Sequence, residues 1–586
     1  MRRIVTTVLI SLLAIPAVSA ADICTTSATP DSLKWVQYFL SRPQDVPGCA
    51  MSLQNGRLVV QPPVSNPALS CPDMFAWKLF AESVAAQFWR NWAADQETWP
   101  GNGLSADPGR PMPLCSTGQS AQNCCNPAAS TNPGYDDPVY KAKYCPYFPG
   151  DHNPANATLR LGVPPSKAHT LGMAARPSFR EALKAEATLA TQILEAPDPS
   201  KGRRIRQSMA EVVFRNKPLF DFVYRNNLYN TEGITSVFNA NAHNIYNSAS
   251  RQSGAPFRLA AESGPLSEIT FPADALMIKS DWMARERAEA MGLREDPANP
   301  FVKMEILSPV LDDNGTILLP GEHWLVAIHF SSKDIPNWVW TTFEHVNNPG
   351  RCDYTGCNDS FGYQSPDPVA NGQARNFTRP HQVCDGLLLP SYVLEPGGAY
   401  PGGARQPALG RVFDALGIGT SDNQTLLPRP GDRAWLSYRL KGTQTQFTDS
   451  TGLPTHLGNS VTEAGFVTTS SCMTCHSRAS TNAGGTVPLP LGVFENGLTE
   501  SGYLPSSSGT PNPAWYNKSG QPPTLLALQT DFIWGFLFAN PIASPALLSS
   551  APAPGGAVAA AVRPGAISPA ARATLLRSAR ERILGP

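Results

Sequence analysis

Charged residues are scarce in this chain, and neither sign prevails. Aspartate, glutamate, lysine and arginine make up 16% of the 586 residues, and 46 basic residues face 46 acidic ones. Soluble domains ordinarily carry about 25% charged residues. Proteins that bind nucleic acid show a basic excess or a basic stripe. The balanced composition therefore argues against a nucleic-acid partner.

Several signatures of common catalytic sites are also missing. The chain contains no G-x-S-x-G, G-x-x-x-x-G-K-[ST], G-x-G-x-x-G or H-E-x-x-H. These patterns mark acyl-transfer nucleophiles, phosphate loops, dinucleotide sites and zinc proteases. Beyond the N-terminus, no stretch approaches eighteen uninterrupted apolar residues. We therefore expect no transmembrane segment in the mature chain.

The one long apolar run lies at the N-terminus. Two arginines precede an almost unbroken apolar stretch, residues 4–18, and Val18-Ser19-Ala20 fits a small-residue cleavage site. This order of charge, apolar run and small residues is the pattern of a secretory signal peptide. We predict that residues 1–20 are a cleaved signal peptide and that the protein is periplasmic. A membrane anchor is the alternative, although the run is short for a bilayer span.

Residues 472–476 read Cys-Met-Thr-Cys-His, the single C-x-x-C-H of the chain. This motif is the attachment signature of a c-type haem, in which two thiols one helical turn apart bond the porphyrin edge and the histidine binds the iron. Composition alone predicts roughly 0.004 such motifs in a chain of this length. We therefore predict that Cys472 and Cys475 attach one covalent haem c, with His476 as the proximal iron ligand.

Three other uses of this motif stay open. A redox dithiol would need a strand before it and a helix N-terminus after it in a βαβ unit, and the Ser/Thr-rich flanks do not predict one. A zinc site would need a second Cys/His pair at short spacing, and none follows. The third alternative is a structural disulfide.

The remaining cysteines and the prolines fit an exported protein. Ten of the 12 cysteines lie outside the motif, an even number, and export permits disulfides. Cys352 and Cys357 are near enough in sequence to form a local bridge. Proline occurs 57 times, about twice its ordinary frequency. The composition predicts a loop-rich chain with up to five disulfides.

The motif and its surroundings resemble known haem proteins. Residues 460–545 are similar in size to the small electron-transfer cytochromes c. Residues 321–346 together with 458–476 resemble large exported bacterial proteins that carry one haem. The resemblance implies a C-terminal, mainly helical, cytochrome c-like haem segment, to which the periplasmic c-haem maturation machinery attaches the cofactor. It implies no substrate and no catalytic residue.

The second axial ligand is the open question. In small cytochromes c a downstream methionine supplies it, whereas this chain has neither methionine nor histidine after His476. The upstream candidates are His329, His456 and His345, and the last is also the candidate catalytic acid or base. Each also fits an ordinary role as a core histidine or a surface group. His323 and His329 are expected on one strand face about 20 Å apart, so they cannot both bind one iron.

Hydrophobic periodicity predicts an α+β protein. A large N-terminal region, residues 21–459, is expected to combine helices with antiparallel sheet and long loops. Residues 460–545 are the predicted haem segment, and 546–586 a flexible Ala/Pro-rich tail with a short basic helix. Helices are expected at 72–92, 179–194, 205–228 and 524–538, and from 460 into the motif. Strands are expected at 323–330, 338–346 and 434–440, with a hairpin turning at 313–315.

These expectations lead to two classes of function. In the first, the protein acts in electron transfer or as a haem-dependent oxidoreductase, with iron cycling between Fe(II) and Fe(III). Its partner is then a redox protein or a small-molecule substrate. In the second, the haem serves a non-enzymatic binding or gas-sensing module. A second protein ligand on the iron would favour electron transfer, and an open position would favour catalysis or sensing.

Overall fold

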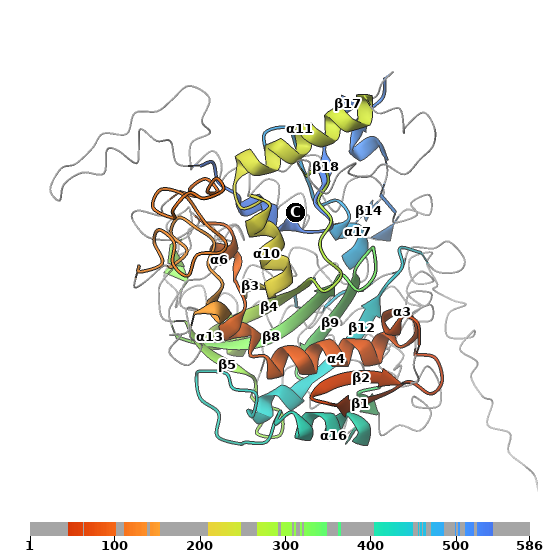
Figure 1. The fold of residues 1–586 in the computed structure, drawn as a ribbon. Coiled ribbons are helices and arrows are strands. Elements are labelled where there is room, and N and C mark those ends of the chain that lie inside the picture. The colour runs from red at the N-terminus through yellow and green to blue at the C-terminus, as the bar shows by residue number, and fades with distance from the viewer. Residues whose placement is uncertain are drawn as a thin grey trace, which may run out of the picture.

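The structure, a computed structural model, describes residues 45–152, 209–247, 266–348, 361–364, 404–463, 470–485 and 498–542, with short gaps inside several of these ranges. Figure 1 shows these parts arranged around a central sheet. The predicted signal peptide, the C-terminal tail, the helix at 179–194 and the Cys352/Cys357 pair lie outside the described residues. None of the helices that the structure describes has both the length and the apolar character needed to span a bilayer.

The central element is a six-stranded antiparallel sheet with the order β12-β9-β8-β4-β3, in which β5 pairs with one end of β8. Its strands are β3 (Met209–Arg215), β4 (Leu276–Ala284), β5 (Lys303–Ile306), β8 (Gly321–Ser332), β9 (Val339–His345) and β12 (Tyr438–Gln444). All of β9 is buried, as is β8 from His323 onward. Both faces of the sheet are therefore covered, and the mixture of helices with antiparallel sheet confirms the α+β class.

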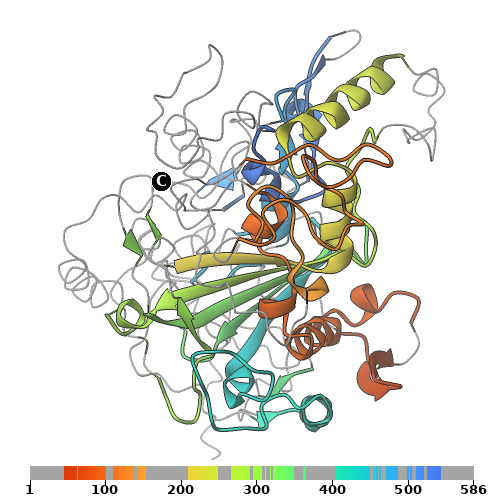
Figure 2. The same ribbon diagram turned by 60° about the vertical axis from the view of Figure 1, so that its left-hand side comes forward.

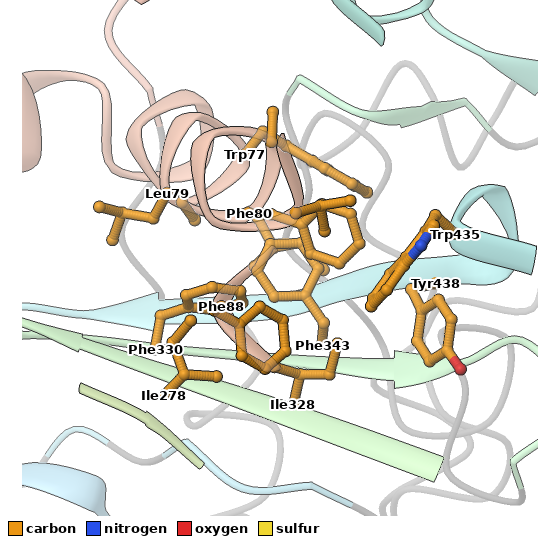
Figure 3. Close-up of a cluster of buried hydrophobic side chains, with 14 of the residues drawn as sticks. Trp77, Leu79, Phe80, Phe88, Ile278, Ile328, Phe330, Phe343, Trp435 and Tyr438 are labelled. Atoms are coloured by element: carbon orange, nitrogen blue, oxygen red, sulfur yellow. The ribbon is translucent and has the colours of Figure 1, made fainter. Parts of the chain in front are cut away.

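One face of the sheet packs against helix α4 (Pro72–Ala85). Phe80 lies at the centre of this contact, with its ring centroid 4.9 Å from that of Phe343 and 6.0 Å from that of Phe330 (Figure 3). The hairpin of β1 (Ala50–Gln54) and β2 (Arg57–Gln61) and helix α16 (Pro407–Ala415) complete the same cluster. This face of the sheet is an apolar core.

Helix α4 is shorter than the predicted helix at 72–92. It begins at Pro72, a residue that suits the first turn because its ring presets φ and no N–H donor is needed there. It ends at Ala85, since Gln87 adopts a left-handed conformation with φ 52°, which an α-helix cannot continue. A separate short helix, α5 (Phe88–Asn91), follows.

The opposite face packs against α10 (Lys217–Arg225), α11 (Thr231–Asn247) and apolar residues between 525 and 539. Figure 2 shows this C-terminal segment in blue, beside α10 and α11. The same hydrophobic cluster contains Val213 of β3 and Met473 of the C-x-x-C-H motif. Residues on both sides of the predicted boundary at 459/460 thus share one core.

Among the described cysteines of the N-terminal part, three disulfides occur: Cys49–Cys71, Cys115–Cys124 and Cys125–Cys145. The last two cross-link residues 110–152, which contain little regular structure beyond the 3-10 turn η1 (Pro149–Asp151). Cross-links of this kind stabilise a segment that lacks its own extensive hydrophobic core.

Strand β8 contains a β-bulge that reverses its side-chain alternation. Between Asp281 and Trp282 of β4, the pairing register skips one residue of β8, Val326. Because successive strand residues face opposite sides, one extra residue exchanges the faces beyond it. The expectation that His323 and His329 share a face is therefore wrong: they lie on opposite faces of the sheet.

One predicted helix is confirmed in part and another is wrong. In the described part of 205–228, residues 209–215 form β3 instead of helix, and the predicted helix is found only as α10, because the Asn216 side chain accepts a hydrogen bond from the Leu219 amide and starts a helix there. Residues 524–538 form β17 (Thr524–Leu525), β18 (Leu528–Gln529) and the 3-10 turn η6 (Trp534–Phe538). Asp531 and Phe532 both have positive φ, which excludes a continuous helix. When every position in a run is apolar, its hydrophobic periodicity cannot distinguish a helix from strands.

The predicted strands agree more closely with the structure than the predicted helices do. Those at 323–330 and 338–346 are confirmed as β8 and β9. The strand at 434–440 starts later than predicted, because η4 (Arg433–Ser437) precedes β12. The hairpin around 313–315 is confirmed by the antiparallel pairing of β6 (Val310–Leu311) with β7 (Ile317–Leu318).

Short elements complete the described parts. They are α3 (Pro67–Ser70), α6 (Asp95–Thr98), α13 (Arg285–Ala290), β10 (Tyr363–Gln364), β11 (Ala404–Arg405), α17 (Cys472–His476), β13 (Ser480–Thr481), β14 (Leu498–Thr499), β15 (Gly502–Tyr503), η5 (Pro513–Trp515) and β16 (Asn517–Lys518). Within the described part of 460–545, α17 is thus the single α-helix, among short strands and 3-10 turns. The mainly helical segment expected there is not found in those residues.

A buried ion pair joins three distant parts of the chain. Arg215 at the end of β3 places Nη2 2.5 Å from Oδ1 of Asp95 in α6, and both side chains are 0% exposed. The guanidinium lies 4.3 Å from the ring centre of Trp99. Gly535 of η6 packs so closely that a Cβ there would lie 2.3 Å from Trp99 and 2.7 Å from Arg215. The pair therefore also holds η6 against the sheet.

Replacing Asp95→Asn should reduce the free energy of unfolding by about 3–5 kcal/mol, because it leaves the buried Arg215 guanidinium without a counter-charge. Urea denaturation followed by tryptophan fluorescence measures the change. The matched control is Asp422→Asn, which breaks the Asp422–Arg433 pair at the surface (80% and 49% exposed). We expect the control to cost less than about 1 kcal/mol. Equal losses in the two variants would contradict the role assigned to the buried pair.

Candidate functional site

The Cys-x-x-Cys-His sequence forms a single helical turn, α17. The Ser471 side chain caps it by accepting a hydrogen bond from the Thr474 amide, an ordinary N-cap interaction. The turn places Cys472 and Cys475 three residues apart, and side chains at this spacing lie on the same face of a helix. The two thiols are thus presented side by side, with His476 directly after them.

Among the cysteines that the structure describes, Cys472 and Cys475 are the two that form no disulfide. Burial raises the pKa of Cys475 to about 11 and the pKa of Cys472 well above its usual value. Both thiols are therefore protonated at neutral pH. A catalytic redox dithiol works through a thiolate of lowered pKa, so these surroundings do not favour that use of the motif.

The His476 ring is held in a defined orientation. Its Nδ1 lies 2.8 Å from the carbonyl oxygen of Phe532, so the N–H at Nδ1 donates to this carbonyl. The lone pair is then on Nε2. The Trp340 ring packs against the imidazole, with 4.3 Å between the centroids. Metal-binding histidines characteristically donate the other ring N–H to a carbonyl or carboxylate in this way.

The loop that presents the Phe532 carbonyl is anchored by Asp531. The Asp531 carboxylate accepts hydrogen bonds from the Phe271 amide at 2.8 Å, Lys333 Nζ at 2.6 Å and Trp338 Nε1 at 3.2 Å. Asp531 and Phe532 have φ values of 46° and 68°, a region that costs non-glycine residues free energy. The three hydrogen bonds offset this cost and fix the carbonyl that orients His476.

Helix α17 is also fastened to the sheet. Gln444 of β12 donates from Nε2 to Ser471 Oγ at 2.9 Å and accepts at Oε1 from the Met473 amide at 3.1 Å. The Met473 side chain is fully buried in the cluster that covers this face. The motif therefore has a firm position over the sheet, although its own helix is short.

The sheet surface that faces the motif carries ionisable side chains. Lys279 of β4 pairs with Glu211 of β3 at 3.1 Å. His329 of β8 lies directly opposite Lys279 in the strand register. Glu463 places Oε2 3.9 Å from Nε2 of His329, and Thr462 donates to Asp281 at 2.6 Å. This part of the face is thus polar, although a hydrophobic cluster covers the rest of it.

Burial changes the pKa values of the ionisable side chains in this group. It raises the pKa of Glu463 to about 8 and lowers the pKa of His329 well below its usual value. The buried carboxyl and the buried imidazole are therefore both neutral at pH 7. Lys279 keeps its positive charge because the neighbouring carboxylates Glu211 and Asp281 raise its pKa despite burial.

The structure places His329 on the face of the sheet that the motif covers, and it does not place His345 there. His345 lies on the other face of the sheet and stacks on Phe301 at 3.5 Å. Its Nε2 bonds the Pro300 carbonyl at 3.2 Å, and its Nδ1 accepts from the Asn347 amide at 3.1 Å. This is the arrangement of a core histidine. His456 lies outside the described residues.

The turn before the motif is capped by Asn459. Its Oδ1 accepts from the Val461 amide at 3.0 Å, and its own amide donates to Glu463 at 2.6 Å. Residues 461–463 form a turn, and α17 begins separately at Cys472. The sequence did not predict the second contact of Glu463, with His329 of the sheet.

Sequence reasoning also missed Lys279, Glu211 and Asp281. Each is a polar residue inside an apolar strand, but only the pairing of β3, β4 and β8 shows that they lie together. Within the described ranges, no group of three or more His, Cys, Asp or Glu residues is arranged to hold a metal ion without a cofactor.

Comparisons with known proteins identify no relative of this chain. No protein-family model, no curated protein and no solved structure matches the chain. The functional argument therefore depends on the residues of the motif and on their surroundings.

The raised pKa of Glu463 should make stability depend on pH. The folded state holds this proton up to about pH 8, whereas the unfolded carboxyl releases it near pH 4.5. The stability contribution is therefore complete below pH 4.5 and is lost as the pH rises to 8. Glu463→Gln, which cannot ionise, should unfold like the wild type at pH 5 and be more stable at pH 9 by a few kcal/mol. Thermal unfolding at both pH values measures this.

A surface variant, Glu82→Gln, is the control for this experiment. Glu82 pairs with Lys78 and its side chain is 39% exposed, so we expect the same pH dependence as in the wild type. If Glu463→Gln loses stability with rising pH as steeply as the wild type does, another group causes the dependence.

Proposed function

We propose that this protein is an exported, periplasmic c-type mono-haem protein that acts in electron transfer or as a haem-dependent oxidoreductase. One haem c is attached through Cys472 and Cys475, and His476 is the proximal iron ligand. The observation that carries the proposal is the hydrogen bond from His476 Nδ1 to the Phe532 carbonyl, beside two thiols that form no disulfide.

The residues present fit the cofactor. Covalent attachment requires two reduced thiols one helical turn apart, and α17 presents them so. Iron ligation requires a neutral imidazole, and donation from Nδ1 places the nitrogen lone pair on Nε2. When bound, haem supplies a one-electron couple between Fe(II) and Fe(III).

The protein's own contribution is position and environment. The Phe532 carbonyl and the Trp340 ring orient His476. A hydrogen-bonded partner of this kind also raises the basicity of the ligating nitrogen. Gln444 fixes α17 on the sheet, and the surrounding apolar cluster limits the access of water. Each of these tunes the reduction potential of a bound haem.

The haem segment of this proposal differs from a small cytochrome c in construction. We propose that residues 460–545 carry the cofactor as a cytochrome c-like segment does, with a support drawn from elsewhere in the chain. The supporting residues come from β8, β9 and β12 as well as from the C-terminal loop. The partner is a redox protein or a small-molecule substrate, and the c-haem maturation machinery of the periplasm acts on α17.

The test is expression in a host with c-haem maturation machinery, followed by denaturation and mass measurement. We expect the polypeptide to carry one covalent haem and to retain its absorbance after denaturation. Cys472→Ser/Cys475→Ser should abolish attachment completely. The matched control, Cys115→Ser/Cys124→Ser, removes a described disulfide and should leave attachment intact.

Two results would contradict the proposal. The first is an unmodified mass and no Soret absorbance in wild-type protein from this host. The second is equal haem content in the double serine variant of the motif and in the wild type. A high-spin haem that binds gases without any turnover would instead favour the non-enzymatic, gas-sensing alternative.

A further inference from the structure

His329 lies in the interior of the sheet, on the face that meets the motif. It occupies β8 between Lys279 of β4 and Thr342 of β9 in the strand register, and it is 8% exposed. The bulge at Val326 gives it this direction, because without the extra residue the alternation would point it to the apolar face.

The Nε2 atom of His329 has no hydrogen-bond partner. Among the described residues it is the one histidine ring nitrogen that is both buried and unbonded. The Glu463 Oε2 atom is 3.9 Å away, beyond hydrogen-bond distance. A buried polar atom without a partner costs about 1–3 kcal/mol, and such atoms in native proteins call for a functional or bound-ligand explanation.

The same histidine lies on the part of the sheet that His476 contacts. Its register partner on β9 is Thr342, and Trp340, two residues away on the same face of β9, packs against the His476 ring at 4.3 Å. An imidazole nitrogen without a hydrogen bond is able to bind iron. His329 and His476 thus approach the same region from the sheet and from α17.

The other histidines of the described strands are already engaged. His323 lies on the opposite face and bonds the Gly321 carbonyl through Nδ1 at 3.0 Å. Both nitrogens of His345 bond backbone groups. The chain has no methionine or histidine after His476, so the downstream ligand of small cytochromes c is missing.

We infer that Nε2 of His329 is the second axial ligand of the iron, opposite His476. The inference rests on the proposed function and deepens it. With both axial positions filled by protein, the site is a six-coordinate electron-transfer centre, and its partner is another redox protein instead of a small molecule that binds iron. Ligation would also satisfy the unbonded nitrogen of the buried imidazole.

The experiment uses purified holoprotein whose covalent haem content has first been shown by mass. We expect a low-spin spectrum in the wild type, with no binding of carbon monoxide by the reduced protein or of cyanide by the oxidised protein. His329→Ala should become high-spin and bind both, and added imidazole should restore the low-spin spectrum. The matched control is His323→Ala on the same strand, which should stay low-spin.

A second variant covers the case in which His329→Ala does not fold. His329→Met offers a thioether ligand of similar length, and we expect it to stay low-spin with a raised reduction potential, because methionine ligation raises the potential relative to histidine. An unchanged potential in a folded, haem-loaded His329→Met protein would overturn the inference.

Failure of the inference and failure of the proposed function are distinguishable. Absence of covalent haem overturns both. Haem that is attached but high-spin in the wild type overturns the His329 ligand alone, and so does a low-spin spectrum that persists in His329→Ala.

Discussion

The alternation of side chains along β8 is the constraint on which the site depends. The central sheet separates an apolar core beneath α4 from a polar surface beneath α17, and each strand residue must face one or the other. One extra residue, Val326, switches the parity of the strand. It turns His323 to the side of α4 and sends His329 to the side of the motif. One extra residue in β8 thus determines which of its side chains face the Cys-x-x-Cys-His turn.

The orientation of His476 depends in turn on the loop at Asp531. This carboxylate binds Lys333 and Trp338, which flank the turn between β8 and β9. The adjacent Phe532 carbonyl accepts the hydrogen bond from His476. The strained backbone of the loop is stable only because the sheet supplies these donors. The motif is therefore held in place by hydrogen bonds that start from the sheet, although the two are far apart in the sequence.

The sequence predicted the parts whose signals are local. The strands β8 and β9 are readable because they are short, continuously apolar runs, and His476 is readable because it belongs to a motif of fixed spacing. Residues 524–538 were misread as a helix, since an apolar run buried on all sides carries no period. The position of His329 could not be predicted, because the face of a strand residue depends on a bulge that appears only in the pairing with β4. The contact of Glu463 with this histidine likewise exists only in three dimensions.

The three disulfides have a consequence for the biogenesis of the chain. Each joins cysteines only 22, 9 or 20 residues apart, and all lie between residues 49 and 145. Loops this short close at low entropic cost, so each bond can form within its own segment and without the C-terminal part of the chain. Once the three bonds have formed, these six thiols can no longer pair with Cys472 or Cys475. Local pairing in the N-terminal part thus keeps six cysteines from competing for the two thiols of the motif.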